Sequence, residues 1–511
     1  MKELVLTSPM CTKNIQNTTP PRIALSNSMT RKLLKFWLFW GCILIVHTTL
    51  GAYKPLSLHP DNPHYFLFRG KPTVLITSGE HYGAVINQDF NYEKYLKTLN
   101  ADGLNLTRIF SGAYYEPLGA FNIASNTLAP MQERFICPWQ RSTTPGYAGR
   151  GLKFDLTRFD PNYFKRLKSF VAQASKLGVV VEMNLFCPFY EEPQWVLSPM
   201  NILNNVNNLG AISRTNVYTL DKHEGLLPIQ EEMVRKIVTE LKEFDNVYYE
   251  ICNEPYFGGV TLAWQRRIAD VIVETEKKLK VQHLISQNIA NEKARVLDPH
   301  PAVSIFNFHY ATPPITVSMN YVLNKAIGDN ETGFRGTNDT HYRVEGWEFI
   351  MAGGALYNNL DYSFTVNHED GTFAYPPRQP GGGSPALRRQ LGYLSKFIHG
   401  FDFLRMKPDN SFIKGGVPEN ATARGLVDPG KAYALYIRAG QKANLKLDLR
   451  QGNYQVEWHN PRETRIEKTS TLQHPGGIAI LESPDYLEDI ALKIVATSKK
   501  TTSKTKSKQK K

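Results

Sequence analysis

Residues 247–255 read Val-Tyr-Tyr-Glu-Ile-Cys-Asn-Glu-Pro, a largely apolar run that ends in polar residues and a proline. The run Val247–Ile251 predicts a short buried β-strand. The flanking stretches, Gln230–Phe244 and Thr261–Leu279, have the amphipathic periodicity of helices. This part of the chain therefore predicts alternating helix, strand and helix, with polar side chains at the carboxyl end of the strand.

The same alternation continues from residue 72 to about 400. Strands are predicted at Thr73–Thr77, Gly103–Ile109, Val179–Phe186, Val247–Ile251, His283–Gln287, Val303–Phe308, Ala326–Gly328 and Leu360–Phe364. Helices are predicted between them at Asn91–Leu99, Pro161–Leu177, Gln230–Phe244, Thr261–Leu279 and Tyr342–Tyr357. Eight strands, most of them followed by a crossover, favour a (β/α)8 TIM barrel. A doubly wound sheet is the alternative, but no glycine-rich fingerprint follows the first strand.

The chain changes character after residue 403. Alternating strands are predicted at Ala432–Arg438, Ala443–Leu449, Tyr454–Trp458, Ile478–Glu482 and Asp489–Val495. Turn residues separate these strands and no helical pattern intervenes, which favours a small all-β sandwich. We therefore predict a leader at 1–52, a barrel at 53–403, a β-sandwich at 404–496 and a tail at 497–511.

The formal net charge of +13 is concentrated at the two ends of the chain. Residues 1–52 carry +5 and residues 497–511 carry +7, which leaves +1 for the body between them. A nearly neutral body lacks the basic footprint of a nucleic-acid binder. The lysine-rich tail cannot bury enough apolar surface to order itself, so we expect it to be disordered. It is either passive or a contact to an anionic envelope polymer.

The N-terminal region has the pattern of a secretory signal. Basic residues at 31–35 precede the apolar run Phe36–Val46, and small residues follow at 51–52. Met29 lies where such a signal normally begins, so translation starting there would omit residues 1–28. The run is shorter than a typical membrane span. We expect a secreted, periplasmic or envelope protein, and an uncleaved N-terminal membrane anchor is the alternative.

Polar and ionisable side chains recur at the carboxyl ends of the predicted barrel strands. In a (β/α)8 barrel these ends carry the catalytic groups. The residues concerned are Glu80, His81, Arg108, Asn184, Asn253, Glu254, His309, Tyr310 and Glu331. The pattern predicts an enzyme active site at this end of the barrel.

Glu254 and Glu331 follow the fourth and seventh strands, so their carboxyl groups are predicted to face each other across the barrel mouth. Hydrolysis of a glycosidic bond needs one carboxyl group to protonate the leaving oxygen and a second to attack or to activate water. The alternatives are a helix cap for Glu254 and a loop carboxylate for Glu331. Two rivals, Glu345 and Glu348, are predicted to lie on a helix surface.

The stretch Tyr248–Pro255 resembles the fourth-strand signature of clan A glycoside hydrolases, the cellulase and mannanase superfamily. Arg108 on strand two, His309-Tyr310 on strand six and Glu331 on strand seven strengthen the resemblance. It covers residues from about 60 to 400. The β-sandwich is similar to those that follow the barrels of bacterial enzymes of this kind.

The resemblance implies a retaining glycosidase with Glu254 as general acid/base and Glu331 as nucleophile. Asn253 would bond the 2-hydroxyl of the reacting sugar, while Arg108 and Tyr310 would hold the nucleophile ionised and oriented. The substrate would be a polysaccharide or an oligosaccharide. We expect further substrate contacts from Glu80, His81, Asn184, His309 and Trp195.

One departure from the family concerns an aromatic side chain. The predicted eighth strand ends in Ser363-Phe364-Thr365 and lacks the sugar-stacking tryptophan common there. Trp195 and Trp139, on long loops, are candidates to replace it, although lone aromatic residues are equally typical of a core.

We expect no metal ion, because no histidines or cysteines have metal-ligand spacing. We also expect no organic cofactor. The cysteines at 137, 187 and 252 are expected to be small buried thiols. The alternative functions are a non-catalytic carbohydrate-binding protein on a barrel scaffold and an envelope-adhesion protein. The loops at 112–151 and 191–225 are long enough to form either a deep pocket or a cleft.

Overall fold

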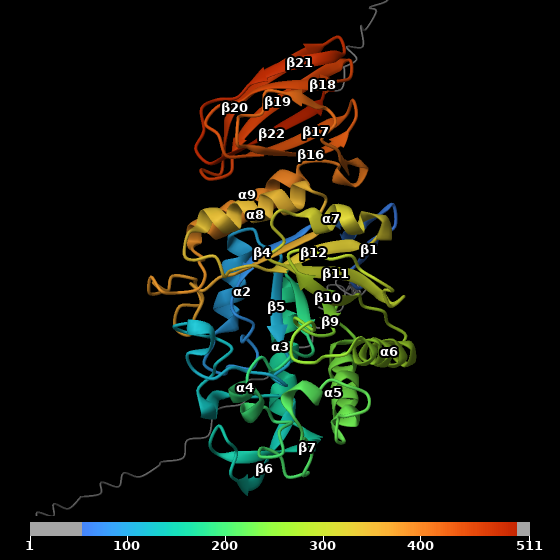
Figure 1. Ribbon diagram of the computed structural model, residues 1–511, viewed down its shortest axis with the longest axis vertical. Helices are drawn as coiled ribbons and strands as arrows, with labels where there is room; N and C mark the ends of the chain where they lie inside the picture. Colours follow the sequence, from blue (N-terminus) through green and yellow to red (C-terminus); the bar gives the residue numbers. More distant parts are fainter. Residues whose placement is uncertain (1–53, 498–511) are drawn as a thin grey trace, which may run out of the picture. The chain divides into compact units, whose positions relative to one another are not determined.

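The computed structural model describes residues 54–497 (Figure 1). The predicted leader and nearly all of the predicted tail lie outside these residues. Within the described part of the chain, no helix has both the length and the apolar character needed to cross a membrane.

Eight parallel strands form the barrel sheet, in the order β4-β13-β12-β11-β10-β9-β8-β5. Their bounds are β4 Leu75–Gly79, β5 Leu106–Phe110, β8 Val180–Asn184, β9 Val247–Glu250, β10 Ile285–Asn291, β11 Val303–His309, β12 Ala326–Glu331 and β13 Leu356–Leu360. The surrounding helices include α2 Tyr92–Ala101, α3 Pro161–Lys176, α5 Leu226–Leu241, α6 Leu262–Leu279, α8 Asp339–Met351 and α9 Pro385–His399. This architecture confirms the predicted (β/α)8 barrel.

Asn105 joins the two strands at the ends of this order. Its backbone N–H donates to the carbonyl of Ile76 at 3.2 Å, and its side-chain oxygen accepts from the N–H of Ile76 at 2.8 Å. Its side-chain nitrogen donates to the carbonyl of Val74 at 2.9 Å. The amide thus continues the hydrogen bonding from β5 to β4 and brings the first and second strands together.

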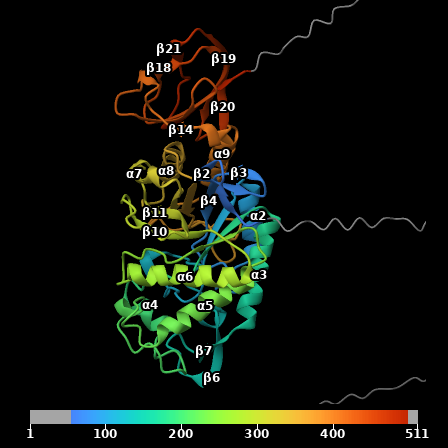
Figure 2. The ribbon, with the colours of Figure 1, turned by 90° about the vertical axis from the view of Figure 1, so that its right-hand side faces the viewer.

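The helices pack outside the sheet with their apolar faces inward. Helix α3 begins as its sequence predicts, because Asp160 caps the N–H of Asn162 at 2.8 Å and Pro161 is the first helical residue. Helices α5 and α6 lie side by side (Figure 2), and Arg267 of α6 binds Glu231 of α5 at 2.6 Å. The helices therefore cover the outer surface of the strands, and loops extend from the carboxyl ends of the strands.

The eighth strand was predicted wrongly. It occupies Leu356–Leu360 rather than Leu360–Phe364, and α8 ends at Met351 rather than at Tyr357. Gly353, at φ +94°, and Gly354 end the helix, because the left-handed conformation favours glycine. The strand is consequently followed by Asp361 and Tyr362.

The residues of the C-terminal part form two antiparallel sheets, in the orders β14-β16-β17-β22-β19-β20 and β15-β18-β21. Their bounds are β14 Lys407–Pro408, β15 Ile413–Gly415, β16 Thr422–Asp428, β17 Ala432–Arg438, β18 Asn444–Leu449, β19 Gly452–Asn460, β20 Arg465–His474, β21 Gly477–Glu482 and β22 Asp489–Ala496. Their facing side chains share a core that includes Leu435, Leu447, Val456 and Leu492. The structure confirms the predicted all-β sandwich.

Helix α8 is buried on all sides, which corrects the prediction for Glu345 and Glu348. Both are buried, not surface residues, because α8 lies between the barrel and strands β16 and β17. Glu348 forms ion pairs with Arg424 at 3.5 Å and Arg438 at 3.3 Å. Arg343 binds both carboxylate oxygens of Asp489 at 3.0 Å. The face that looked solvent-exposed in the sequence is therefore an interface with the sandwich.

Candidate active site

A cavity of about 290 Å³ lies at the carboxyl ends of the barrel strands. Of the predicted site residues, those in its wall are His81, Asn253, Glu254, Tyr310 and Glu331. The wall also contains Tyr82, Glu116, Tyr190, Asn291 and the phenylalanines 110, 121, 257 and 334, none of which was predicted. The cavity thus combines carboxyl groups with an aromatic wall, as in many small-molecule sites.

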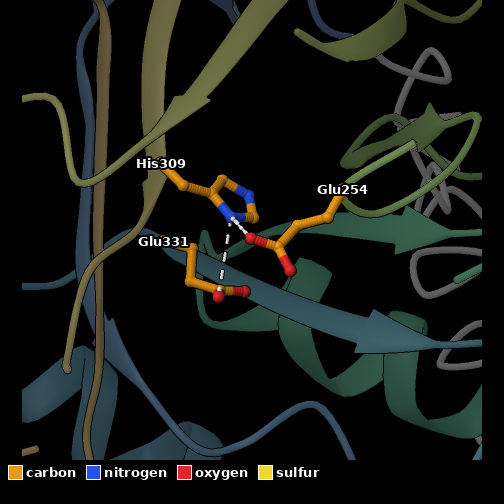
Figure 3. Close-up of side chains that lie close together, drawn as sticks. All are labelled: Glu254, His309 and Glu331. Carbon is orange, nitrogen blue, oxygen red and sulfur yellow. Dashed lines mark hydrogen bonds and ion pairs between the residues drawn. The ribbon is translucent and has the colours of Figure 1, made fainter. Parts of the chain in front are cut away.

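Glu254 and Glu331 face each other beside His309 (Figure 3). The Nδ1 atom of His309 lies 3.1 Å from Oε1 of Glu254 and 3.5 Å from Oε1 of Glu331. One carboxylate oxygen of each glutamate and a ring nitrogen of His309 all lie within 4.8 Å of one another. The two carboxyl groups that were predicted to meet across the barrel mouth are therefore close enough to act on one bond.

Glu331, the last residue of β12, accepts hydrogen bonds on both oxygens. Tyr310 donates to Oε1 at 2.7 Å, Tyr82 donates to Oε2 at 2.8 Å, and Arg108 contacts Oε2 at 3.2 Å. Two hydroxyl donors and one guanidinium donor therefore fix the orientation of the Glu331 carboxyl group.

Glu254 is surrounded by donors as well. Tyr190 donates to its Oε2 at 2.6 Å and Tyr256 to its Oε1 at 3.1 Å. Burial acts to raise the pKa of Glu254, but the hydrogen bond and charge of His309, together with the two tyrosine hydroxyls, outweigh it and hold that pKa below its ordinary value. The affinity of this carboxyl group for a proton therefore depends on its donors.

Three residues around the two carboxyl groups have a left-handed backbone. Their φ angles are +58° at Tyr82, +37° at Glu254 and +54° at Tyr310. Each follows a barrel strand, and such a conformation in a non-glycine residue costs of order 1–3 kcal/mol. Strained positions of this kind concentrate at functional sites, and here they orient Glu254 and the two tyrosines that donate to Glu331.

Arg108 lies beneath the cavity in a fully buried network. Its guanidinium contacts Glu182 at 2.8 Å and Glu331 at 3.2 Å, and it also binds Glu250. Burial, followed by the charge of Glu250, raises the pKa of Glu182 to about 8. Arg108 also donates to Oδ1 of Asn253 at 2.7 Å, which fixes that amide in the wall.

Two predicted substrate contacts lie elsewhere. The carboxylate of Glu80 accepts the N–H groups of Gly83 and Ala84 at 2.9 and 3.1 Å, so it pins the turn that carries Tyr82. Trp195 is buried and donates to the carbonyl of Ile212 at 3.1 Å. Neither lies in the cavity wall, because these hydrogen bonds hold each side chain against the backbone of a loop.

Three further residues were predicted to contact the substrate, namely Asn184, Trp139 and His81. Asn184 is buried at the end of β8 and does not reach the cavity wall, and Trp139 is buried in its loop. His81 is in the wall, where burial lowers its pKa to about 4. In place of a tryptophan after the eighth strand, Tyr362 packs against Phe334 with ring centroids 6.2 Å apart.

Of the described residues, Glu254, His309 and Glu331 form the one group that could bind a metal ion together. The oxygens of both carboxyl groups already accept hydrogen bonds from tyrosine, histidine or arginine. This arrangement suits proton transfer and nucleophilic attack. Cys137, Cys187 and Cys252 are free and buried, as predicted.

Comparisons with known proteins agree with this geometry. Residues 68–310 match the family model described as cellulase (glycosyl hydrolase family 5). A solved structure named "Glycoside hydrolase" has a TM-score of 0.59 at 15% identity and covers 87% of this chain and 98% of its own. A glycoside hydrolase family 5 protein from Bacteroides vulgatus ATCC 8482 has a TM-score of 0.58 at 14% identity, with coverages of 87% and 95%. No curated protein matches the chain.

The matched stretch begins at the last residue of strand β2, Asn62–Phe68, ahead of the barrel, and ends directly after His309. It therefore contains Arg108, Asn253 and Glu254 but not Glu331. At such low identities the solved structures show the fold alone. Over residues 68–310 the barrel is therefore similar to the cellulases of glycosyl hydrolase family 5, which is consistent with the cellulase-like superfamily expected from the sequence.

Proposed function

We propose that this protein hydrolyses O-glycosidic bonds of an oligosaccharide or polysaccharide by double displacement, with net retention of configuration. Glu331 is the nucleophile and Glu254 the general acid/base. The observation that carries the proposal is the close approach of these two carboxyl groups, with oxygens within 4.8 Å of each other. Retaining enzymes have carboxyl groups about 5–5.5 Å apart, whereas inverting enzymes need about 6.5–9.5 Å. The predicted signal sequence supports action outside the cytoplasm.

In the first step a carboxylate oxygen of Glu331 attacks the anomeric carbon while Glu254 gives its proton to the departing oxygen. This forms a glycosyl ester on Glu331 and releases the leaving group as an alcohol. In the second step Glu254 takes a proton from water, whose oxygen attacks the same carbon and frees Glu331. Glu254 ends protonated, so the site returns to its starting state.

The two roles of Glu254 need opposite protonation states, and the site provides for both. A bound sugar excludes water and adds to the burial that acts to raise the pKa of Glu254. Formation of the ester removes the negative charge of Glu331, which lowers the cost of ionising Glu254. The same carboxyl group is thereby favoured as an acid in the first step and as a base in the second.

The proposal is tested with a panel of aryl glycosides and of plant and algal polysaccharides. We expect release of sugar from at least one member, and the first product seen by proton NMR should keep the anomeric configuration of its substrate. A product of opposite configuration would contradict the double displacement. Binding of a glycan without turnover would favour the non-catalytic alternative.

Tyr190→Phe is expected to move the basic limb of the pH profile of kcat/KM to higher pH. The hydroxyl of Tyr190 is one of the groups that lower the pKa of Glu254, so its loss raises that pKa. The basic limb reports loss of the proton from the acid, and we expect a shift of about one unit or less.

Tyr92→Phe is the matched control, because the Tyr92 hydroxyl binds Ser169 at 2.9 Å and lies outside the cavity wall. Its profile should overlay that of the parent protein. A basic limb that stays in place in Tyr190→Phe would argue against Glu254 as the titrating acid.

A further inference from the structure

The tyrosine hydroxyl that donates to Oε2 of Glu254 has a complete set of hydrogen-bond partners. Nδ2 of Asn253 donates to Oη of Tyr190 at 2.9 Å, and the thiol of Cys187 donates to the same oxygen at 3.6 Å. A hydroxyl oxygen accepts two hydrogen bonds and donates one. With both acceptor positions filled, the single proton of Tyr190 is directed to Glu254, whose Oε2 lies 2.6 Å away.

The amide of Asn253 can act only as a donor toward Tyr190. Its Oδ1 accepts a hydrogen bond from the guanidinium of Arg108 at 2.7 Å, and a guanidinium has no acceptor atom. Nδ2 is therefore on the opposite side of the amide, where its hydrogens face Oη of Tyr190 at 2.9 Å and Sγ of Cys187 at 3.6 Å. Arg108 thus fixes the direction of a chain of donors that ends at Glu254.

Cys187 and Tyr190 both keep their protons at neutral pH. Cys187 lies in the wall of the catalytic cavity but is only 1% exposed, and burial raises the pKa of its thiol well above the ordinary value. Burial also raises the pKa of Tyr190 well above its ordinary value. The thiol is therefore a neutral donor, and the tyrosine hydroxyl keeps the one proton that it can give.

The other oxygen of Glu254, Oε1, has different neighbours (Figure 3). It lies 3.1 Å from Nδ1 of His309, and the same nitrogen lies 3.5 Å from Oε1 of Glu331. Nδ1 of a neutral histidine can accept a hydrogen bond as well as donate one. Tyr256 also reaches Oε1, at 3.1 Å, but its proton has an alternative acceptor in Oδ1 of Asn291. Oε1 can therefore carry a proton, whereas Oε2 faces a hydroxyl whose other two neighbours are both donors.

We propose that Cys187 and Asn253 are positioning residues for the acid/base. Both direct the proton of Tyr190 to Oε2 of Glu254, and so they confine the proton that the acid gives up to Oε1. This inference rests on the proposed function. Oε1 is the oxygen that shares a neighbour with Glu331, so its proton is on the side where the bond is attacked. In the first step this proton moves to the departing oxygen as that oxygen takes the electron pair of the cleaved bond.

Cys187→Ala removes one donor to Tyr190, so the freed acceptor position can take the acid proton from Oε2, away from the departing oxygen. On a phenyl glycoside, whose leaving group needs a proton, kcat/KM should fall about three- to tenfold, the range of one net hydrogen bond. On the dinitrophenyl glycoside of the same sugar, which needs no acid, the fall should be less than about twofold. Cys187→Ser keeps a donor and should recover most of the loss on the phenyl glycoside.

A double-mutant cycle with Tyr190→Phe shows whether Cys187 acts through this hydroxyl. Phenylalanine has no oxygen, so Cys187→Ala should cause little further loss when it is added to Tyr190→Phe. Cys137→Ala is the matched control, because Cys137 is another free, buried thiol, bonded to the carbonyl of Trp139 at 3.6 Å, and lies outside the cavity wall. It should keep the parent rate on both glycosides.

Three results would overturn the inference and leave the proposed function standing. They are parent activity in Cys187→Ala, equal losses on the two glycosides, and a loss that adds fully to that of Tyr190→Phe. If Cys187→Ala does not fold, Cys187→Val takes its place, because valine fills the volume of the thiol without providing a donor. Absence of hydrolysis by the parent protein with every glycoside and polysaccharide would overturn the proposed function itself.

Discussion

Replacing Glu331 with alanine is expected to lower kcat by about 10⁴-fold or more, equivalent to about 5.5 kcal/mol of transition-state stabilisation. Alanine has no oxygen to attack the anomeric carbon, and Tyr82, Tyr310 and Arg108 lose the anion to which they donate. The space left by the carboxyl group admits a small anion. Sodium azide should therefore restore part of the activity and form a glycosyl azide of inverted configuration, which NMR can identify.

Glu254→Ala gives the contrast that separates the two roles. Without its acid the protein should lose far more activity on glycosides with poor leaving groups than on a dinitrophenyl glycoside, whose leaving group needs no proton. Azide should then attack the ester on Glu331 and give a product of retained configuration. Glu243→Ala, an exposed carboxylate after α5, is the control and should keep the parent rate. Full activity in Glu331→Ala would exclude Glu331 as the nucleophile.

The part of the site that lies at the ends of strands could be predicted from the sequence. Glu254, Tyr310 and Glu331 each end or closely follow a short apolar run, and Arg108 lies two residues before the end of β5. Parallel strands bring such positions toward one rim. The prediction needed only the order of the strands, and small errors in their bounds did not affect it. The prediction of the eighth strand was wrong because the apolar pattern of α8 continues through Gly353-Gly354 into β13. The sequence pattern therefore does not show where the helix ends and the strand begins.

The residues that tune the carboxyl groups could not be found in this way. Tyr82 and Tyr190 lie in the loops after β4 and β8 and reach the site through loop conformation, which hydrophobic periodicity does not encode. The nearest signal for Tyr82 was its position directly after Glu80 and His81. Glu116 lies in the long loop after β5, with no pattern around it. Such residues are placed by tertiary contacts, and only the structure reveals them.

A second group of carboxyl residues lies in the barrel interior and was not among the predicted site residues. Glu182 and Glu250 interrupt apolar strands, β8 and β9, and point into the barrel, where both are fully buried. Asn330 donates to both, at 2.7 and 2.9 Å, and Tyr248 donates to Glu182 at 2.6 Å. In the apolar pattern that predicts a strand, buried carboxyl residues appear only as interruptions, and the pattern gives no sign of their role. Their presence makes the single cation among them, Arg108, important for stability as well as for the site.

Arg108→Met is expected to lower the free energy of unfolding by about 3–5 kcal/mol, the usual cost of removing one partner from a buried ion pair. Methionine keeps much of the apolar stem but leaves Glu182, Glu250 and Glu331 without their cation. Solvent cannot compensate for the lost charge, because Arg108 is only 2% exposed and bulk water does not reach its carboxylate partners. Chemical denaturation followed by circular dichroism measures the change, and kcat should fall as well because Glu331 loses a donor.

A matched pair of variants separates the charge of Arg108 from its packing. Arg267→Met breaks the partly exposed ion pair with Glu231 between α5 and α6, and it should cost less than about 1 kcal/mol. Adding Glu250→Gln to Arg108→Met removes one unpaired carboxylate, so the double variant should regain part of the lost stability. Equal stability of the single and double variants would mean that Arg108 acts through packing alone. Recovery of stability without recovery of kcat would show that Arg108 has two separable roles, one in balancing charge inside the barrel and one in holding Glu331 for attack.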